Sequence, residues 1–323
     1  MPTTKPRALN VALGAARGSL LVVYDAEDRP APDQLRLAAA RFAADPDLAC
    51  LQARLIVHNP GDSWLSQMFA VEYATLFDLI NPGLAALDLP IPLGGTSNHF
   101  RVETLRRVGA WDAWNVTEDA DLGMRLAFAG VRVATLASST AEEAPVVFAS
   151  WFRQRVRWQK GWMQTLIVHS RRPLCFARAL GRCRALAALA VIGGSTLGGL
   201  FGPPLFFAAL WRAVSGQLVA ARGWEIFGDV AIYLLALSGL MTMAVPGLPA
   251  MRRRRIEARP SILATLPLYY AMICLATWAA LFDLAIRPHH WAKTEHGVRR
   301  VRRSRPAAPP IVQGAKRGRP ISI

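Results

Sequence analysis

The chain has 323 residues, of which 53% are hydrophobic, and its mean hydropathy is positive. That length allows one large domain or two ordinary ones, while the hydrophobic share excludes a purely soluble enzyme and predicts a membrane portion. The formal net charge is +16, and the basic residues concentrate in Arg252–Arg255 and in the tail after Arg287. Beside long apolar stretches, such clusters are typical of the cytoplasmic flanks of membrane helices and of contacts with anionic lipid.

The same composition argues against two other classes of protein. No basic domain with interleaved aromatic residues accompanies the charge, so nucleic-acid binding is the weaker interpretation. The chain has four cysteines without any C-x-x-C pair, at Cys50, Cys175, Cys183 and Cys274. Neither a zinc site nor a disulfide framework is therefore indicated.

Residues 1–180 alternate short β-rich runs with helical stretches. Strands are predicted at Ser19–Tyr24, Leu51–Val57 and Val131–Leu136. Helices are predicted at Gln34–Ala44, Trp64–Leu79, Leu105–Val108, Asp121–Ala129 and Val147–Leu166. Pro90–Leu93 reads as a short extended run into a Gly94-Gly95 turn. This order predicts an α/β domain with a parallel sheet, whose functional residues lie at strand ends.

The start of this domain is unusual. A nucleotide-binding α/β half normally begins with a strand and a turn, whereas this chain enters with a polar segment and reaches a strand only at Ser19. We therefore expect residues 1–180 to form a partial cytoplasmic domain whose N-terminal half lies outside this chain. The alternative is a complete domain with an uncommon beginning.

Residues 181–298 form the predicted membrane region, and residues 299–323 a basic tail that contains proline. Three apolar stretches are long enough to cross about 30 Å of hydrocarbon: Ala185–Val214, Ile226–Met251 and Ile262–Ile286. Gly202-Pro203-Pro204 is expected to break the first stretch, separating an interfacial piece from a true span.

The two basic clusters predict the topology of this region. If both are cytoplasmic, the number of crossings between them is even, so we expect residues 262–286 to form an interfacial or partly buried helix. Two crossings would then precede Arg252, in a multi-pass protein of the cell inner membrane with a cytoplasmic catalytic domain. Three plain spans, with the basic tail outside, remain the alternative.

Asp25 and Glu27 follow the first apolar strand two residues apart, so their carboxylates face one side of an extended chain. Two such groups at the carboxyl edge of a sheet suit a divalent cation, and Mg²⁺ or Mn²⁺ would bridge their oxygens to a diphosphate. Acidic residues after a strand are also common turn formers and helix caps. The pair alone leaves both interpretations open.

Thr117-Glu118-Asp119 precedes the helical stretch Asp121–Ala129. Thr117 can cap that helix, with the acidic residues in its favourable first turn. The functional alternative is that Asp119 acts as a general base toward an acceptor hydroxyl.

Gln154, Arg157 and Trp158 fall at i, i+3 and i+4 of a predicted helix and therefore share one face. An amide, a guanidinium and an indole can bind a sugar, because the ring stacks on the indole while the polar groups bind hydroxyls or a phosphate. The neighbouring Arg and Trp residues are equally typical of an amphipathic helix at a bilayer surface, and both interpretations can hold at once.

Taken in this order, the three motifs resemble the D-x-D, T-E-D and Q-x-x-R-W signature of processive family 2 glycosyltransferases. Bacterial cellulose synthase and the hyaluronan and chitin synthases belong to this group. Residues 5–10 also resemble the Lys-x-x-x-Leu-Asn segment of the family, and residues 291–297 resemble the gating-loop region of cellulose synthases. The resemblance covers nearly the whole chain and implies a partial GT-A type nucleotide-diphospho-sugar transferase domain followed by helical membrane segments.

By position, the resemblance implies that Asp25 and Glu27 hold the metal and the diphosphate, and that Asp119 is the catalytic base. Lys5 would contact the donor diphosphate, and residues 94–99 would line the donor or acceptor pocket. The acceptor end of the glycan would lie on Gln154, Arg157 and Trp158. Three residues of a gating loop would close over the nucleotide: Lys293, Thr294 and His296.

The expected reaction is inverting transfer of a sugar from a nucleotide sugar, for which we expect a UDP-sugar, to a growing polysaccharide, coupled to membrane export. Membrane lipid and export-complex subunits are the further expected partners, and nucleic acid is not among them. A non-processive transferase that glycosylates a lipid carrier is one alternative, against which the Q-x-x-R-W motif argues. A catalytically incomplete membrane subunit with a scaffold role is the other.

Overall fold

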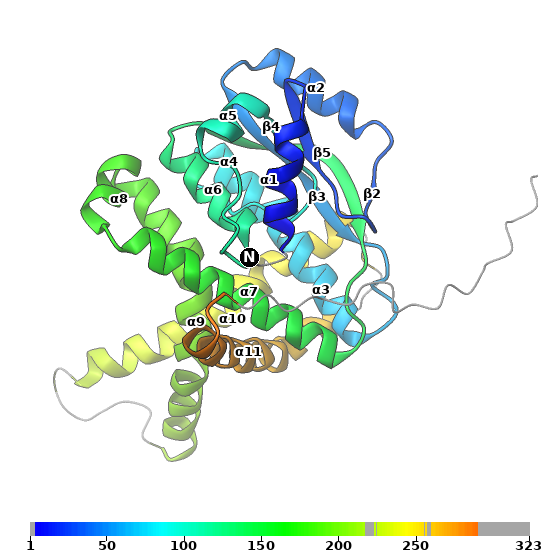
Figure 1. The fold of residues 1–323 in the computed structure, drawn as a ribbon. Coiled ribbons are helices and arrows are strands. Elements are labelled where there is room, and N and C mark those ends of the chain that lie inside the picture. The colour runs from blue at the N-terminus through cyan, green and yellow to red at the C-terminus, as the bar shows by residue number, and fades with distance from the viewer. Residues whose placement is uncertain (1–3, 217–222, 224, 255, 257–259, 290–323) are drawn as a thin grey trace, which may run out of the picture.

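The computed structural model describes residues 4–216, 223, 225–254, 256 and 260–289 (Figure 1). Its described part contains one mixed sheet with the strand order β1-β4-β3-β5-β2. The strands are β1 (Leu20–Val23), β2 (Arg29–Pro30), β3 (Leu48–Val57), β4 (Asn98–Arg101) and β5 (Arg132–Glu142). The predicted α/β class is confirmed.

The prediction of a parallel sheet is wrong, because only β3 and β5 run parallel. Strand β4 lies antiparallel between β1 and β3, and β2 pairs antiparallel with β5. Strand β4 was not predicted because its residues, Asn98–Arg101, form no apolar run. Its first three side chains are nevertheless buried. β4 returns the chain from the Gly94-Gly95 turn into the middle of the sheet, and this brings that turn to the end of β1.

The helices of the first half are α1 (Lys5–Ala15), α2 (Gln34–Ala44), α3 (Trp64–Thr75), α4 (Asn81–Ala86), α5 (Val102–Arg107) and α6 (Glu118–Phe128). Those of the second half are α7 (Phe148–Ser170), α8 (Pro173–Leu180), α9 (Arg182–Val214), α10 (Glu225–Arg254) and α11 (Leu266–Ile286). Helix α1 was not expected from its polar sequence. Pro6 stands in its first turn, where proline is tolerated, and Leu9 and Leu13 pack one turn apart on the core.

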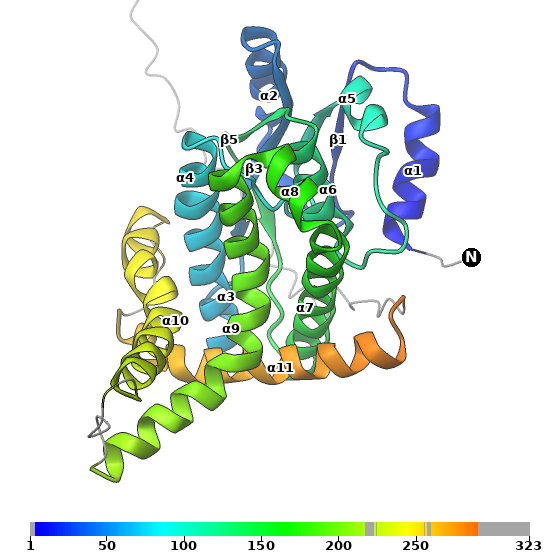
Figure 2. The same cartoon turned by 90° about the vertical axis from the view of Figure 1, so that its left-hand side faces the viewer.

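Helices cover both faces of the sheet (Figures 1 and 2). Successive strand residues point to opposite faces, so Leu51 packs with Phe42 of α2 while Cys50 packs with Leu122 of α6 on the other side. The second face also receives Leu13 of α1. The carboxyl ends of β1, β3 and β5 are left as the edge on which polar side chains gather.

A π-helical turn, Leu76–Ile80, joins α3 to α4 without a break in the helix. Asp78 of this turn accepts two hydrogen bonds from the guanidinium of Arg254 at the end of α10, which also donates to the Leu55 carbonyl at 2.8 Å. The expected lipid contact of this basic cluster is therefore wrong for Arg254, because its charge is used to dock α10 on the α/β domain.

Helix α9 continues through Pro203 and Pro204, so the expected break there is a bend inside one helix (Figure 2). Pro204 has no N–H for the carbonyl of Leu200, and the indole of Trp278 donates to that carbonyl at 3.2 Å. Helix α11 crosses α9 at this level. A Cβ on Gly199 would lie 2.3 Å from the Thr277 hydroxyl, so a glycine is required where the two helices meet.

Two described stretches are long and apolar enough to cross a membrane, by length and composition only: Arg182–Val214 and Ser261–Ile286. Figure 2 shows α11 running across the end of α3. Helix α11 packs against both α7 and α9, and its contacts with α7 extend from the Trp151–Tyr269 hydrogen bond to the Lys160–Asp283 ion pair. The interfacial helix expected for residues 262–286 stays a prediction.

Candidate active site

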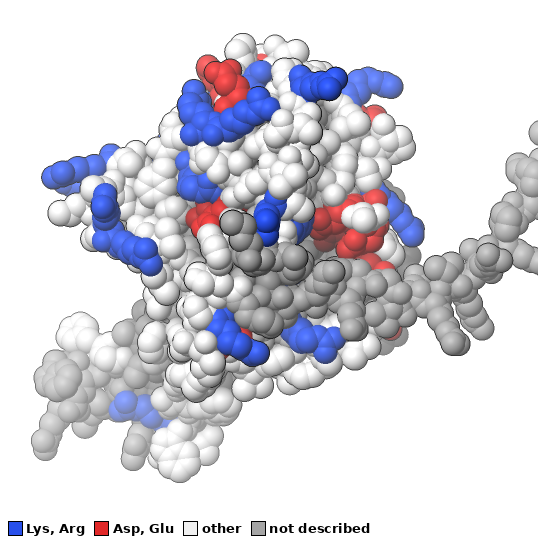
Figure 3. Space-filling model, in the orientation of Figure 1, with Lys and Arg blue, Asp and Glu red and all other residues white. Residues whose placement is uncertain are grey.

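The first group of polar residues follows β1 at the edge of the sheet. The backbone N–H of Asp25 donates to Asp28 Oδ2 at 3.0 Å and to the Thr96 hydroxyl at 3.2 Å. Thr96 in turn donates to Asp28, and Glu27 is exposed on the turn between them. The structure thus joins Asp25 to Asp28, a residue that the D-x-D spacing did not single out. Figure 3 shows acidic side chains gathered on this side of the domain, near β2, with basic ones beside them.

Lys5 forms an ion pair with Asp25 and donates to the Gly95 carbonyl at 2.7 Å. Burial alone would lower the pKa of Lys5, but the neighbouring charges of Asp25, Glu118 and Asp119 raise it. The ammonium is therefore firmly charged and stands between the β1 turn and the glycine turn. The two residues that the resemblance assigns to the donor diphosphate, Lys5 and Asp25, thus lie together in the fold.

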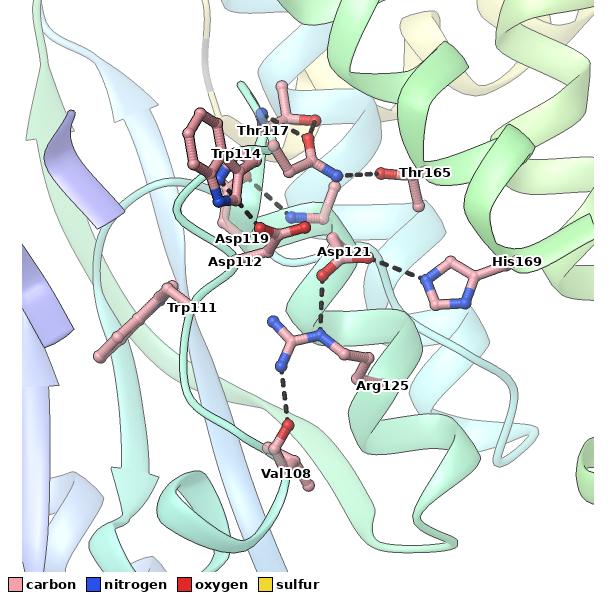
Figure 4. Close-up of polar contacts among 12 residues, drawn as sticks. Val108, Trp111, Asp112, Trp114, Thr117, Asp119, Asp121, Arg125, Thr165 and His169 are labelled. Carbon is pink, nitrogen blue, oxygen red and sulfur yellow. Dashed lines mark hydrogen bonds and ion pairs between the residues drawn. The ribbon is translucent and has the colours of Figure 1, made fainter. Parts of the chain in front are cut away.

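Asp119 lies in the first turn of α6, beside this ion pair. A Cβ built on Gly95 would lie 3.0 Å from Asp119 Oδ2 and 3.7 Å from Lys5 Nζ, so the three residues are neighbours. Gly95 therefore allows the carboxylate to approach the lysine. Figure 4 shows Asp119 and Asp121 pointing in different directions, since Asp121 turns toward His169 and Arg125.

Burial and like charge perturb the acids of this motif. Burial raises the pKa of Glu118 to about 8, and repulsion by Asp119 adds to the rise. The pKa of Asp119 is also raised, again by burial, although Lys5 and Arg157 oppose the shift. A carboxylate whose pKa is raised toward neutrality is suited to accept a proton from a hydroxyl.

Helix α7 packs directly on this motif through Gly161, which lies against Thr117. Around that contact, the Gln164 side chain accepts from the N–H of Val116 at 3.1 Å. Thr117 is the N-cap residue of α6, but its hydroxyl makes no capping hydrogen bond, so the expected cap is not formed. The Thr117 side chain packs against Gly161 of α7 instead.

Gln154, Arg157 and Trp158 lie on α7, and the first of them shares the helix face of Gly161, two turns away. Arg157 interacts electrostatically with Glu118, Asp119 and Asp25, and burial lowers its pKa. The Gln154 side chain is 9% exposed, and its Oε1 has no hydrogen-bond partner among the described residues. The fold thus brings the second and third motifs together, with Arg157 reaching the acids.

Lys160 of α7 makes two hydrogen bonds to residues at the C-terminal end of α11. The ammonium of Lys160, 1% exposed, donates to Asp283 Oδ2 at 2.7 Å and to the Arg287 carbonyl at 2.6 Å. His289 then lies against Trp114 with ring centroids 5.2 Å apart, beside the loop that leads to α6. The chain after α11 therefore leaves close to Asp119's motif. The gating-loop residues Lys293, Thr294 and His296 lie outside the described residues.

The donor set suits a divalent cation in its chemistry. Asp25, Glu27 and Asp28 offer only carboxylate oxygens, the ligands that Mg²⁺ and Mn²⁺ prefer. Among the described side chains there is no group of three His, Cys, Asp or Glu arranged to hold a metal. This is compatible with Mg²⁺ sites that use one or two carboxylates and complete their shell with substrate phosphates and water.

The structure also brings in residues that sequence reasoning missed. Glu142, at the end of β5, is one residue beyond the pairing of Ala141 with Arg29 and so lies beside Asp28. Burial and the charge of Asp28 raise its pKa to about 8, and the Tyr73 hydroxyl is hydrogen-bonded to it. Its position at the carboxyl end of a strand was the available signal. Only the correct strand end, Glu142 instead of the predicted Leu136, would have shown it.

Comparison with known proteins places the chain in a family. A family model described as "Glycosyl transferase family group 2" matches residues 20–283. The Probable glucomannan 4-beta-mannosyltransferase 1 of Arabidopsis thaliana is 27% identical over 142 residues, which are 44% of this chain and 26% of that protein. The Beta-monoglucosyldiacylglycerol synthase of Synechocystis sp. is 28% identical over 166 residues, which are 50% of this chain and 33% of that protein.

This chain thus matches about a quarter to a third of the length of these curated relatives. Among solved structures, the mannosyltransferase PcManGT from Pyrobaculum calidifontis, in complex with GDP-Man and Mn²⁺, has a TM-score of 0.42 at 17% identity. That match covers 88% of this chain and 67% of the other. Since the family model spans most of its length, the chain belongs to glycosyl transferase family group 2.

Proposed function

We propose that this chain carries the catalytic centre of an inverting hexosyltransferase that moves a sugar from a nucleotide sugar to a growing polysaccharide at the cytoplasmic face of a membrane. The observation that supports it best is the convergence of Asp119 and the Lys5–Asp25 ion pair at Gly95. One group able to take a proton and one able to bind phosphate thus lie on the same edge of the sheet.

The proposed reaction is a single displacement at the anomeric carbon. Asp119 takes the proton of the acceptor hydroxyl, and the hydroxyl oxygen forms the new bond to the carbon. The bond from that carbon to the diphosphate breaks, and its electron pair leaves on the phosphate oxygen. Lys5 and Arg157 place positive charge beside the developing negative charge, where fixed charges contribute most to lowering the barrier.

A divalent cation would be held by Asp25 and Glu27 and would neutralise charge on the leaving diphosphate. Lys5 offsets the charge of Asp25 through their ion pair. The three carboxylates of residues 25–28 would otherwise repel a diphosphate.

The acceptor is proposed to lie along α7, on Gln154, Arg157 and Trp158. The buried Gln154 Oε1, which has no hydrogen-bond partner among the described residues, would accept a hydrogen bond from a sugar hydroxyl. Two relatives are glucomannan 4-beta-mannosyltransferases by name, which supports a polysaccharide acceptor. A link between synthesis and export is part of the same proposal.

A membrane lipid is the second candidate acceptor. The apolar side chains Leu197, Phe201 and Phe207 of α9 are exposed, and one relative is a Beta-monoglucosyldiacylglycerol synthase by name. In that case the same Asp119 would act on the hydroxyl of a lipid at the membrane surface.

A panel of sugar nucleotides tests the donor. The protein in membranes would be incubated with UDP-glucose, UDP-N-acetylglucosamine and GDP-mannose, with Mg²⁺, with Mn²⁺ and with EDTA. Release of nucleoside diphosphate should occur with one donor and should disappear in EDTA. Analysis of the product as polymer or glycolipid separates the two acceptors. Absence of release with every hexose donor would contradict the proposal.

A further inference from the structure

Arg155 lies on α7 next to Gln154, and its guanidinium packs over the ring of Trp158, one of the proposed acceptor residues. Its guanidinium makes a bidentate ion pair with Glu72 of α3, at 2.5 Å and 2.7 Å. The Tyr269 hydroxyl of α11 completes this group, because it donates to Glu72 Oε2 at 2.7 Å and accepts from Arg155 at 3.1 Å. Three helices therefore meet at one arginine that is 4% exposed.

Four aromatic rings surround the same guanidinium. Its central carbon lies 4.8 Å from the ring centroid of Trp158, the shortest of four such distances. The other three rings are those of Trp151, Phe69 and Tyr269, at 5.3, 5.5 and 5.9 Å. Contacts of this kind are strongest when the cation is removed from water, as it is here.

The charge of Arg155 is fixed by its surroundings. Burial alone would lower the pKa of Arg155, but the carboxylate of Glu72 raises it well above its ordinary value. The planar guanidinium is held at both nitrogen ends by Glu72, so it cannot turn away from the indole. A lysine would keep the positive charge, but its ammonium is not planar and cannot donate two parallel hydrogen bonds to a carboxylate.

We infer that Arg155, held by Glu72 and Tyr269, is a positioning residue that fixes the indole of Trp158 for stacking on the acceptor sugar. Trp158 is half-buried, with Arg155 over one of its faces and Phe69 tilted against it at 5.7 Å. This inference rests on the proposed function for the acceptor, but the placement of the indole is a separate physical claim.

Arg155→Lys tests the inference, with Arg153→Lys as the matched control because Arg153 lies on the same helix and is exposed. In membranes carrying the full chain, transfer of sugar to acceptor and hydrolysis of donor by water are measured together. A displaced indole should lower the ratio of transfer to hydrolysis at least about tenfold, since small misplacements of a bound reactant are costly. Tyr269→Phe keeps the ring and should fall between the control and Arg155→Lys.

A second measurement does not need turnover. With 5-fluorotryptophan incorporated, the ¹⁹F resonance of Trp158 is assigned by its loss in Trp158→Phe. It should shift or broaden in Arg155→Lys and stay in place in Arg153→Lys.

An unchanged resonance together with an unchanged ratio in folded Arg155→Lys would overturn the inference. Failure of the wild-type protein to release nucleoside diphosphate would instead contradict the proposed function, and the fluorine resonance would still decide the role of Arg155.

Discussion

Gly161 of α7 lies against Thr117 at the start of α6 so closely that a Cβ on the glycine would be 2.1 Å from the threonine hydroxyl oxygen. Any other residue at 161 would force the two helices apart. This contact therefore sets the distance between the helix that carries Trp158 and the turn that carries Asp119, and the two proposed halves of the site depend on it.

Gly161→Ala should destabilise the protein by about 1–3 kcal/mol, the usual cost of overpacking a core. It should also lower the rate of sugar transfer, because the added methyl group displaces α7 from Thr117. Thermal unfolding in detergent and transfer per folded molecule check both parts. Gly14→Ala is the control, because no atom lies within 4 Å of its built Cβ and it should leave both quantities close to wild type. Equal effects of the two changes would refute the packing account.

The buried Lys160–Asp283 pair predicts an asymmetric response. Asp283→Asn leaves the ammonium of Lys160 beside a neutral amide in a site that is 1% exposed, and should cost about 3–5 kcal/mol. Lys160→Met should cost less, since Asp283 keeps its contact with Arg287 at 3.0 Å and is partly open to water. Arg287→Gln, at the exposed end of that contact, serves as the control. Melting temperatures that rank Lys160→Met below Asp283→Asn would disagree with this order.

The raised pKa of Glu118 predicts a pH dependence of stability. A carboxyl whose folded pKa lies above its ordinary value contributes stability at low pH, and that contribution is lost as the pH rises toward about 8. Glu118→Gln cannot ionise, so the variant should lose less stability than wild type between pH 5 and pH 8.5, values spanning that window. Parallel melting curves at several pH values give the test. A constant difference between the two proteins across this range would be the contrary result.

The contact of Arg254 with Asp78 holds the end of α10 against the α/β domain, which in the proposed membrane topology is cytoplasmic. A topology reporter fused after Arg254 should therefore report the cytoplasm, as the positive-inside rule also requires. Asp78→Asn should weaken this docking and make α10 more accessible to protease in membranes. A periplasmic signal at that position would be incompatible with the proposed topology.

Much of the fold could be predicted from sequence periodicity. The helix Gln34–Ala44 has the predicted bounds, and Phe148–Ser170 and Leu20–Val23 lie close to the predicted ones, because their apolar spacing or length is distinctive. Strand β4 could not be predicted, since its burial comes from two neighbouring strands rather than from its own residues. The same strand explains why the sheet is mixed.

The candidate site shows the same division. The motifs and the segment of residues 5–10 identify residues that the fold does bring together, notably Lys5, Asp25 and Asp119. Arg155 and Glu72, by contrast, are 83 residues apart, and no local pattern connects a buried arginine with its partner on another helix. Contacts made by tertiary packing of three helices leave no periodic trace in the sequence.

The central claim is that Asp119 removes the proton of the acceptor, and Asp119→Asn tests it most directly. Asp121→Asn is the comparison, because that acid lies two residues away and turns to His169 and Arg125 instead (Figure 4). The measurement is the rate of sugar transfer per folded molecule, together with equilibrium binding of the donor nucleotide sugar. The account predicts that Asp119→Asn lowers transfer by about 100-fold or more, with donor binding near wild type, while Asp121→Asn affects mainly stability. Retention of more than about a tenth of the transfer rate by Asp119→Asn would contradict it.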